Sequence, residues 1–91
     1  MSDFAKKYPC RSPKAAYRVI DNEAVVVMPQ EGTVNIINET GSFIWQLCDG
    51  HNSPANIARK ISGEFQVAKQ AAGADVKEFI RGLSEKGMII S

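Results

Sequence analysis

Residues 24–50 have the sequence AVVVMPQEGTVNIINETGSFIWQLCDG, and the spacing of their apolar residues changes once, at Asn38. Before Asn38, the β-branched run 24–28 and the alternating segment 33–37 are typical of strands. The Pro-Gln-Glu-Gly segment between them is typical of a tight turn. After Asn38, apolar residues recur at helical spacing. A hairpin that leads directly into a helix predicts an α+β fold.

Working outward from this segment, a further strand is expected upstream and two further helices downstream. Residues 16–20 alternate roughly in polarity, and Asp-Asn-Glu at 21–23 is a turn signal that joins them to the next strand. Three short strands joined by tight turns predict an antiparallel meander. The expected element order is three strands followed by three helices (βββααα), with residues 15–91 as the domain and residues 1–14 as a flexible basic arm.

The first two helices have local start and stop signals. Asn38 is a good N-cap, and Gly50 is expected to take the left-handed conformation that ends the first helix. Ser53 followed by Pro54 is a strong N-terminal signal for the second helix. The first helical stripe contains Ile44, Leu47 and Cys48, and Trp45 beside it is expected in the core.

The third helix is expected from about Ala74 to Lys86 and is ended by Gly87. Its apolar residues have the spacing 0, 3, 4, 7 that is typical of an amphipathic helix. Residues 66–73 either extend the second helix or form a loop. Residues 88–90 are apolar and are expected to be extended and to pack on the core. The apolar stripe consists of Val76, Phe79, Ile80 and Leu83.

The composition argues against several classes of function. The chain has 91 residues and a net charge of +1, whereas nucleic-acid-binding domains are usually strongly basic. The charge is uneven, since residues 1–18 carry five basic residues and one acidic residue. This segment is either a solvated tail or a tail that helps to hold an acidic partner. We expect a cytoplasmic protein without signal peptide or membrane span, because two cysteines make no disulfide framework and no long apolar run is present.

The sequence offers little catalytic chemistry. His51 is the single histidine, and no Cys/His cluster or glycine-rich phosphate loop is present. We therefore expect no metal, no organic cofactor and no enzymatic activity. Cys48 is interpreted as a core residue, with a Cys48–His51 catalytic pair as the alternative. Asp75 and Glu78 are interpreted as acids in the first turn of the third helix.

The order and spacing of these motifs resemble the PqqD family over about residues 15–90. The most specific block runs from Asn38 to Leu47-Cys48-Asp49-Gly50, and Asp75-Val76 and Phe79-Ile80 follow it at the right distance. The chain departs from the family pattern at two single positions and in residues 66–73, which are unusually rich in Ala and Gln. Ile37 stands where Leu is commoner, and Gly41 stands where Ala is common.

The resemblance implies a winged helix-turn-helix-like domain that binds the leader segment of a ribosomally made precursor peptide. Such a RiPP recognition element acts as a peptide chaperone that presents the leader to a modifying enzyme, often a radical-SAM enzyme. In the namesake pathway the product is pyrroloquinoline quinone, and related peptide-modification pathways use the same domain. The precursor, the enzyme and the product stay open at this point.

The resemblance also implies a groove between the strand 33–37 and the third helix. The uncharged edge of this strand suits the addition of a peptide as a fourth strand. The helix presents either the flank with Asp75, Glu78 and Gly82 or the flank with Lys77 and Arg81. The candidate peptide-binding residues are Thr33, Val34, Asn35, Ile36, Ile37, Asp75, Glu78, Arg81 and Gly82.

Two other functions compete with peptide binding. A winged-helix DNA-binding protein would use residues 74–86 as its recognition helix, but the three acidic and three basic residues of this segment sum to zero. A helix that lies next to phosphates is expected to be basic. A structural or oligomerisation module is the other alternative.

Overall fold

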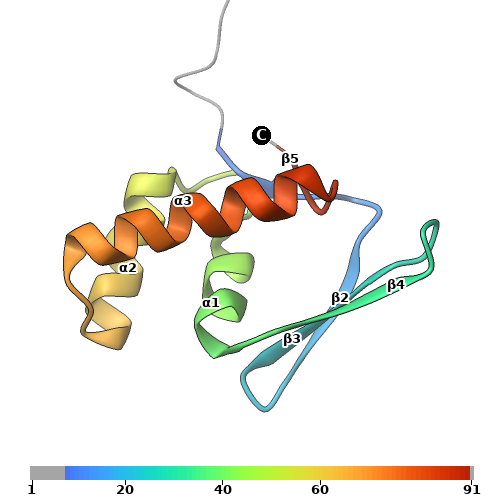
Figure 1. The fold of residues 1–91 in the computed structure, drawn as a ribbon, viewed down its shortest axis with the longest axis horizontal. Coiled ribbons are helices and arrows are strands. Elements are labelled where there is room, and N and C mark those ends of the chain that lie inside the picture. Colours follow the sequence, from blue (N-terminus) through green and yellow to red (C-terminus); the bar gives the residue numbers. More distant parts are fainter. Residues whose placement is uncertain (1–7, 91) are drawn as a thin grey trace, which may run out of the picture.

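The computed structural model of the protein describes residues 8–90 and confirms the α+β fold (Figure 1). A three-stranded antiparallel sheet has the order β2-β3-β4 and precedes three helices. A second, two-stranded sheet pairs β1 with β5. The elements are β1 (Cys10–Arg11), β2 (Ala16–Ile20), β3 (Glu23–Met28), β4 (Thr33–Ile37), α1 (Glu39–Leu47), α2 (Pro54–Phe65), α3 (Lys69–Glu85) and β5 (Ile89–Ile90).

The turn between β2 and β3 sets the register of the sheet. Asp21 and Asn22 have φ angles of 51° and 68°, and Ile20 pairs with Glu23. A two-residue turn in which both φ angles are positive is a type I′ turn, whose twist matches that of the flanking strands. The two residues that flank such a turn form a hydrogen-bonded pair. This pair therefore determines to which side each backbone group of β3 points.

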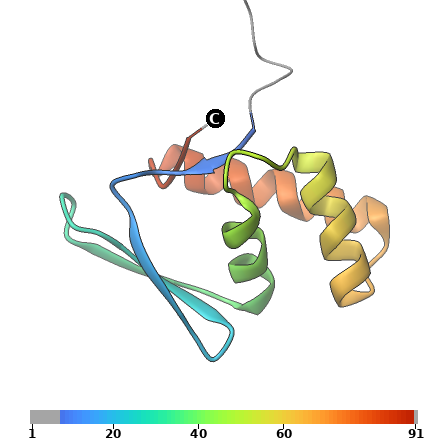
Figure 2. The same ribbon diagram turned by 180° about the vertical axis from the view of Figure 1, so that it is seen from behind.

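Helix α1 lies between the sheet and α2, and α3 runs across them so that its C-terminal end reaches the sheet (Figure 2). Its inner face packs on the inner face of β3, and both α2 and α3 contribute apolar residues to the same core. Trp45 is fully buried, as expected, and its ring makes a T-shaped contact with the ring of Tyr17, with 5.5 Å between the two centroids. The largest fully buried core side chains are Ile44, Trp45, Ile57, Ile61, Met88, Ile89, Val26, Val76 and Cys48.

The N-capping signals of the sequence are confirmed. The Asn38 side chain accepts a hydrogen bond from the Gly41 N–H at 2.9 Å, and the Ser53 hydroxyl accepts one from the Asn56 N–H at 3.0 Å. Gly87 follows the C-cap of α3 with a positive φ and ends that helix, as expected. Gly50 also has a positive φ, but the C-cap of α1 is Cys48, so Gly50 lies one residue beyond the expected position and its N–H bonds the Pro9 carbonyl at 3.0 Å. After α3, the Met88 N–H bonds the Leu83 carbonyl at 2.9 Å, as in a Schellman motif. This turn directs residues 88–90 back onto the core, as expected.

The start of α3 differs from the expectation. The helix begins at Lys69, so residues 69–73 belong to α3. Helix α2 ends at Phe65, and Gln66 after it has a left-handed conformation. Residues 66–73 therefore neither extend the second helix nor form a loop throughout. Ala72 is fully buried in the core, and this packing stabilises the helical conformation of the Ala-rich segment. The N-cap is Ala68, whose side chain makes no capping bond. The helix therefore starts without a local signal.

The expected arm also needs correction. Residues 1–7 lie outside the described part of the chain, but residues 10–11 form β1, and Pro9 is fully buried. The Arg11 side chain donates hydrogen bonds to the carbonyls of Trp45 and Gln46 at 3.0 and 2.8 Å. Helix α1 has no basic residue in its last turn, so Arg11 supplies the positive charge that the C-terminal end of a helix favours. This segment is therefore packed against the domain.

Candidate functional site

Strand β4 is an edge strand, and the register identifies its free backbone groups. Alternate residues of β3, beginning with Ala24, direct their backbone groups toward β4, because Glu23 is hydrogen-bonded to β2. The Met28 carbonyl follows this pattern, since it accepts a bond from the Gly32 N–H on the β4 side. The N–H and C=O groups of Val34 and Ile36 consequently point away from β3. The residues of β4 that face β3 are Thr33, Asn35 and Ile37.

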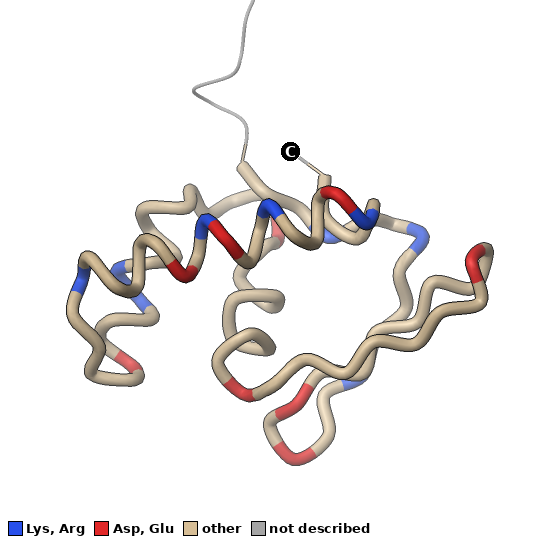
Figure 3. Tube along the Cα trace, in the orientation of Figure 1, with Lys and Arg blue, Asp and Glu red and all other residues tan. Residues whose placement is uncertain are grey.

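The two faces of β4 differ in character. Val34 and Ile36 are 63% and 69% exposed and lie on the outer face of the sheet, opposite Val27 and Val25. The side chains of Thr33, Asn35 and Ile37 lie on the inner face, which is the face that packs toward the helices. No charge interrupts the strand (Figure 3). Nothing along this edge therefore blocks pairing with another chain.

A cleft of about 460 Å³ lies between the inner face of β4 and the C-terminal end of α3. Thr33 and Asn35 border it on the strand side, and Glu85 and Lys86 border it on the helix side. Met28 and Met88 contribute apolar surface to it, and both side chains are buried. The cleft thus joins a free strand edge to the flank of a helix.

The structure identifies which flank of α3 faces β4. Phe79 lies close to Gly41, at the point where β4 leads into α1, and Lys86 borders the cleft. Asp75 and Gly82 are four residues before and three residues after Phe79, so they lie on the same flank. Lys77 lies on the opposite flank, where it lines a groove shared with α2. The flank with Asp75 and Gly82 is therefore the one beside the strand.

Two of the candidate residues lie on the outer ridge of α3. The Arg81 guanidinium bonds the Glu78 carboxylate at 2.5 Å and the Glu85 carboxylate at 3.3 Å, and all three side chains are mostly exposed. The hydrogen bond that Arg81 donates to Glu78, together with the negative charges of Glu78 and Glu85, raises the pKa of Arg81. Exposed pairs of this kind contribute little to stability. Glu78 and Arg81 border the strand-facing flank without lining the cleft.

Sequence reasoning missed the cleft residues at the end of α3. In the sequence, Glu85 and Lys86 are two of the charges of the third helix, whereas Met28 belongs to an expected strand and Met88 to the packed C-terminal segment. A signal was present for Lys86, because it follows Phe79 by seven residues and Gly82 by four. Once the strand-facing flank is known, helical periodicity places Lys86 on it.

Cys48 is a core residue, as expected. It is fully buried, and burial raises the pKa of its thiol to about 12. The thiol therefore stays neutral near pH 7, whereas the thiolate is the nucleophile that a Cys–His pair needs. His51 is exposed. Its backbone N–H donates a hydrogen bond to the Asp49 carboxylate, and this bond lowers the pKa of Asp49.

We expect Cys48→Ala to lower the free energy of unfolding by about 1–2 kcal/mol, because the substitution leaves a small cavity in the core. Ligand affinity of the folded fraction is expected to stay unchanged. Urea unfolding and a binding titration measure the two effects separately. A folded variant that has lost binding would instead make Cys48 a site residue.

Two structural observations bear on other kinds of site. Within residues 8–90, no group of three or more His, Cys, Asp or Glu side chains could hold a metal ion. In the same part of the chain, none of the helices is long and apolar enough to cross a membrane.

The fold is shared with solved recognition domains. A structure described as TbiB1 in complex with the TbiA(beta) leader peptide is 29% identical, with a TM-score of 0.81 over 88% of this chain and 93% of that one. Lasso peptide synthetase B1, complexed with its leader peptide, is 24% identical, with a TM-score of 0.81 over 91% and 98%. A PqqD truncation from Methylobacterium extorquens, described as a stand-alone RiPP recognition element, is 19% identical, with a TM-score of 0.75 over 91% and 88%. The fold is thus that of RiPP recognition elements.

The family follows from the sequence match. Residues 23–89 match the family model described as coenzyme PQQ synthesis protein D, PqqD. The chain belongs to the PqqD family, and the resemblance stated above is confirmed. Among curated protein sequences, none matches this chain.

The DNA-binding alternative is not supported. The solved structures that share the fold include domains described as complexes with leader peptides. The corrected helix α3 carries three basic residues and three acidic residues, so it remains neutral. Arg81 is also engaged by two carboxylates. The zero net charge of α3 disagrees with the basic character expected of a helix that lies next to phosphates.

Proposed function

We propose that this chain is a non-catalytic recognition domain that binds the leader of a ribosomally made precursor peptide and presents it to a modifying enzyme. The observation that carries the proposal is the free, uncharged edge of β4 beside a cleft formed with α3. The family match and the leader-peptide complexes of structurally similar domains support it.

The leader adds to the sheet as a strand next to β4. Val34 and Ile36 each offer one N–H donor and one C=O acceptor to it. Side chains of the added strand alternate between two surroundings. One set lies on the outer face beside the exposed Val34 and Ile36, and the other set enters the cleft beside Thr33, Asn35 and α3.

The two sets define the chemistry of a suitable leader. The outer set is apolar, because it extends the apolar cross-strand rows of the sheet. The inner set meets Glu85 and Lys86 on the helix side of the cleft and Glu31 beside the start of β4. A leader segment of about 10–15 residues buries on the order of 1,000 Å², in the range of weak or standard interfaces. An affinity near 1 μM corresponds to about −8 kcal/mol.

The class of the modifying enzyme and the pathway are proposed from the resemblance to the family. The modifying enzyme belongs to the radical-SAM class, and the pathway is pyrroloquinoline quinone biosynthesis or a related peptide modification. The recognition domain itself uses no cofactor. We place the protein in the cytoplasm, which the two free cysteines support.

An NMR titration with a synthetic peptide of the cognate leader tests the proposal. We expect the amides of residues 33–37 and 75–82 to shift together, because the leader lies between β4 and the strand-facing flank of α3. A peptide of the same composition in scrambled order is the control and is expected to leave these amides in place. Shifts that cluster on residues 54–65 would contradict the edge-strand mode of binding.

A further inference from the structure

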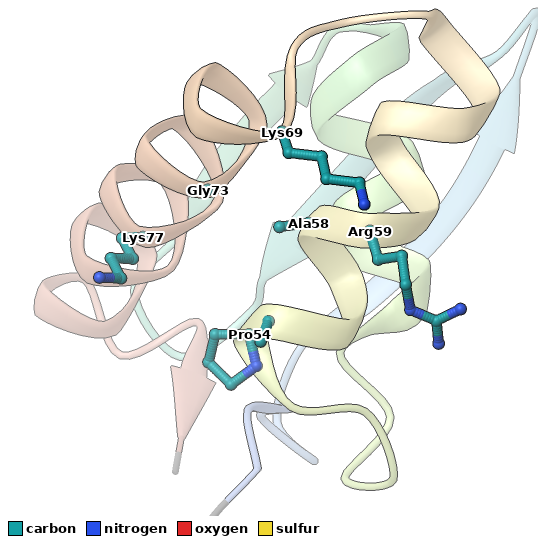
Figure 4. Close-up of a pocket in the computed structure, with 7 residues that line it drawn as sticks. Pro54, Ala58, Arg59, Lys69, Gly73 and Lys77 are labelled. Carbon is teal, nitrogen blue, oxygen red and sulfur yellow. The ribbon is translucent and has the colours of Figure 1, made fainter.

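The opposite flank of α3 forms a second groove, which the leader site does not use. This groove lies between α2 and α3 and has a volume of about 330 Å³ (Figure 4). Ala58 of α2 and Gly73 of α3 lie along its middle, and Pro54 and Ala55 lie at one end. The two grooves are therefore separated by the body of α3, so both are accessible at the same time.

The floor of this groove is apolar and open because its residues are small. A Cβ atom added to Gly73 would meet nothing within 4 Å, and Ala58 offers a single methyl group. The absence of large side chains leaves room for apolar side chains of a partner. Small residues on two neighbouring helices also allow another helix to approach closely.

Three cations lie at the rims of this apolar floor, and in Figure 4 the Arg59 guanidinium and the Lys77 ammonium point outward from the groove. Lys69 and Lys77 come from α3, and Arg59 comes from α2. Figure 4 shows Lys69 extending across the groove toward α2 above Ala58. No acidic residue lines the groove, and within residues 8–90 none of the three cations is in a salt bridge. The Arg59 guanidinium bonds the neutral side chain of Asn56.

The spacing of the cations limits the form of the ligand. Lys69 and Lys77 are eight residues apart on one helix flank, with Gly73 halfway between them. The rise of an α-helix places their Cα atoms about 12 Å apart along the axis. An acidic helix that lies along the groove matches this spacing with carboxylates two turns apart and places apolar side chains between them.

We propose that the groove between α2 and α3 binds an acidic amphipathic helix of the modifying enzyme while the leader occupies β4. This inference rests on the proposed function, which supplies the enzyme as second partner. The leader does not suit the groove, because a leader that adds to β4 is extended. Charge complementarity with Arg59, Lys69 and Lys77 identifies the acidic character of the helix.

A designed peptide probes the groove directly. The probe is a helix-forming peptide of about 18 residues with a leucine stripe and two glutamates about 12 Å apart. Titrated into ¹⁵N-labelled protein at about 50 mM salt, it is expected to shift the amides of residues 54–59 and 69–77. The same peptide with glutamine in place of glutamate is expected to bind at least about tenfold more weakly. Equal binding of the two peptides, or shifts confined to residues 33–37, overturns the proposal.

Charge reversal tests the cations against a matched control. Lys69→Glu combined with Lys77→Glu is expected to weaken binding of the acidic probe at least about tenfold. Arg18→Glu combined with Lys60→Glu changes the net charge equally at exposed positions outside the groove and is expected to keep the affinity within about twofold. If both double variants lost the same affinity for the probe, net charge alone would explain the loss, and the proposed groove site would be wrong.

Two helical glycines separate this proposal from the leader-binding function. Gly73 and Gly82 are both in α3, and a Cβ atom added at either position meets nothing within 4 Å. Gly73→Leu is expected to abolish probe binding and leave leader binding unchanged, and Gly82→Leu is expected to do the reverse. Circular dichroism checks the fold. If Gly73→Leu still binds the probe, the groove is not the binding site of the probe. If the leader fails to bind the wild-type protein, the proposed function is wrong.

Discussion

Ile36→Pro is expected to weaken leader binding at least tenfold while the domain stays folded, a loss of about 1.4 kcal/mol or more. Proline removes one N–H group, and at Ile36 this group points to the free edge, where it bonds only an added strand. Edge strands tolerate proline when its nitrogen faces outward. Isothermal titration calorimetry with the leader peptide measures the loss.

Two variants isolate the backbone effect. Ile36→Ala truncates the same exposed side chain and keeps the N–H group, so it is expected to lose less affinity than Ile36→Pro. Asn35→Pro removes an N–H group that faces β3, so its main effect is expected on stability. Equal affinities of Ile36→Pro and Ile36→Ala would show that the edge N–H makes no bond to the leader.

Most elements of this fold were predictable because their signals are local. Strands β2 and β4 have the expected bounds, since a turn of recognisable sequence lies at one end of each. The N-caps Asn38 and Ser53 fix the starts of α1 and α2. The start of α3 has no such signal, because its N-cap is an alanine and burial of Ala72 decides its extent. Where a tertiary contact determines a boundary, sequence patterns do not show it.

The same distinction applies to the candidate site. The uncharged strand 33–37 identifies the edge from the sequence, but the direction of each N–H group follows from the type I′ turn two strands away. The strand-facing flank of α3 depends on the rotation of that helix about its axis, which packing determines. Arg11 likewise ties β1 to α1 through carbonyls 34 and 35 residues away in sequence. A basic residue in a segment that contains two prolines carries no sign of such a contact.

Gly41→Val is expected to lower the free energy of unfolding by about 3 kcal/mol, at the upper end of the cost of overpacking. Gly41 is buried in the first turn of α1, and a Cβ atom there would lie 2.5 Å from Ile37 Cγ2 and 2.9 Å from Phe79 Cε1. Urea unfolding measures the change as a lower midpoint with an unchanged slope. Gly63→Val is the control, because Gly63 is also helical but its Cβ atom would meet nothing within 4 Å.

The contact between Gly41 and Ile37 involves two positions at which the family resemblance leads us to expect Ala and Leu, respectively. Leucine at position 37 has no branch at Cβ, so the Cγ2 atom that meets the added Cβ is absent. Ile37→Leu is therefore expected to recover at least about 1 kcal/mol of the loss caused by Gly41→Val, measured as the coupling energy of a double-mutant cycle. If the effects of the two substitutions on stability are additive, the clash of the added side chain is with Phe79 instead.

Because Ile37 ends β4 and Phe79 lies on the strand-facing flank of α3, the same contact sets the distance between β4 and α3 beside the cleft. We therefore expect Gly41→Val to weaken leader binding in its folded fraction, and Gly63→Val to leave it unchanged.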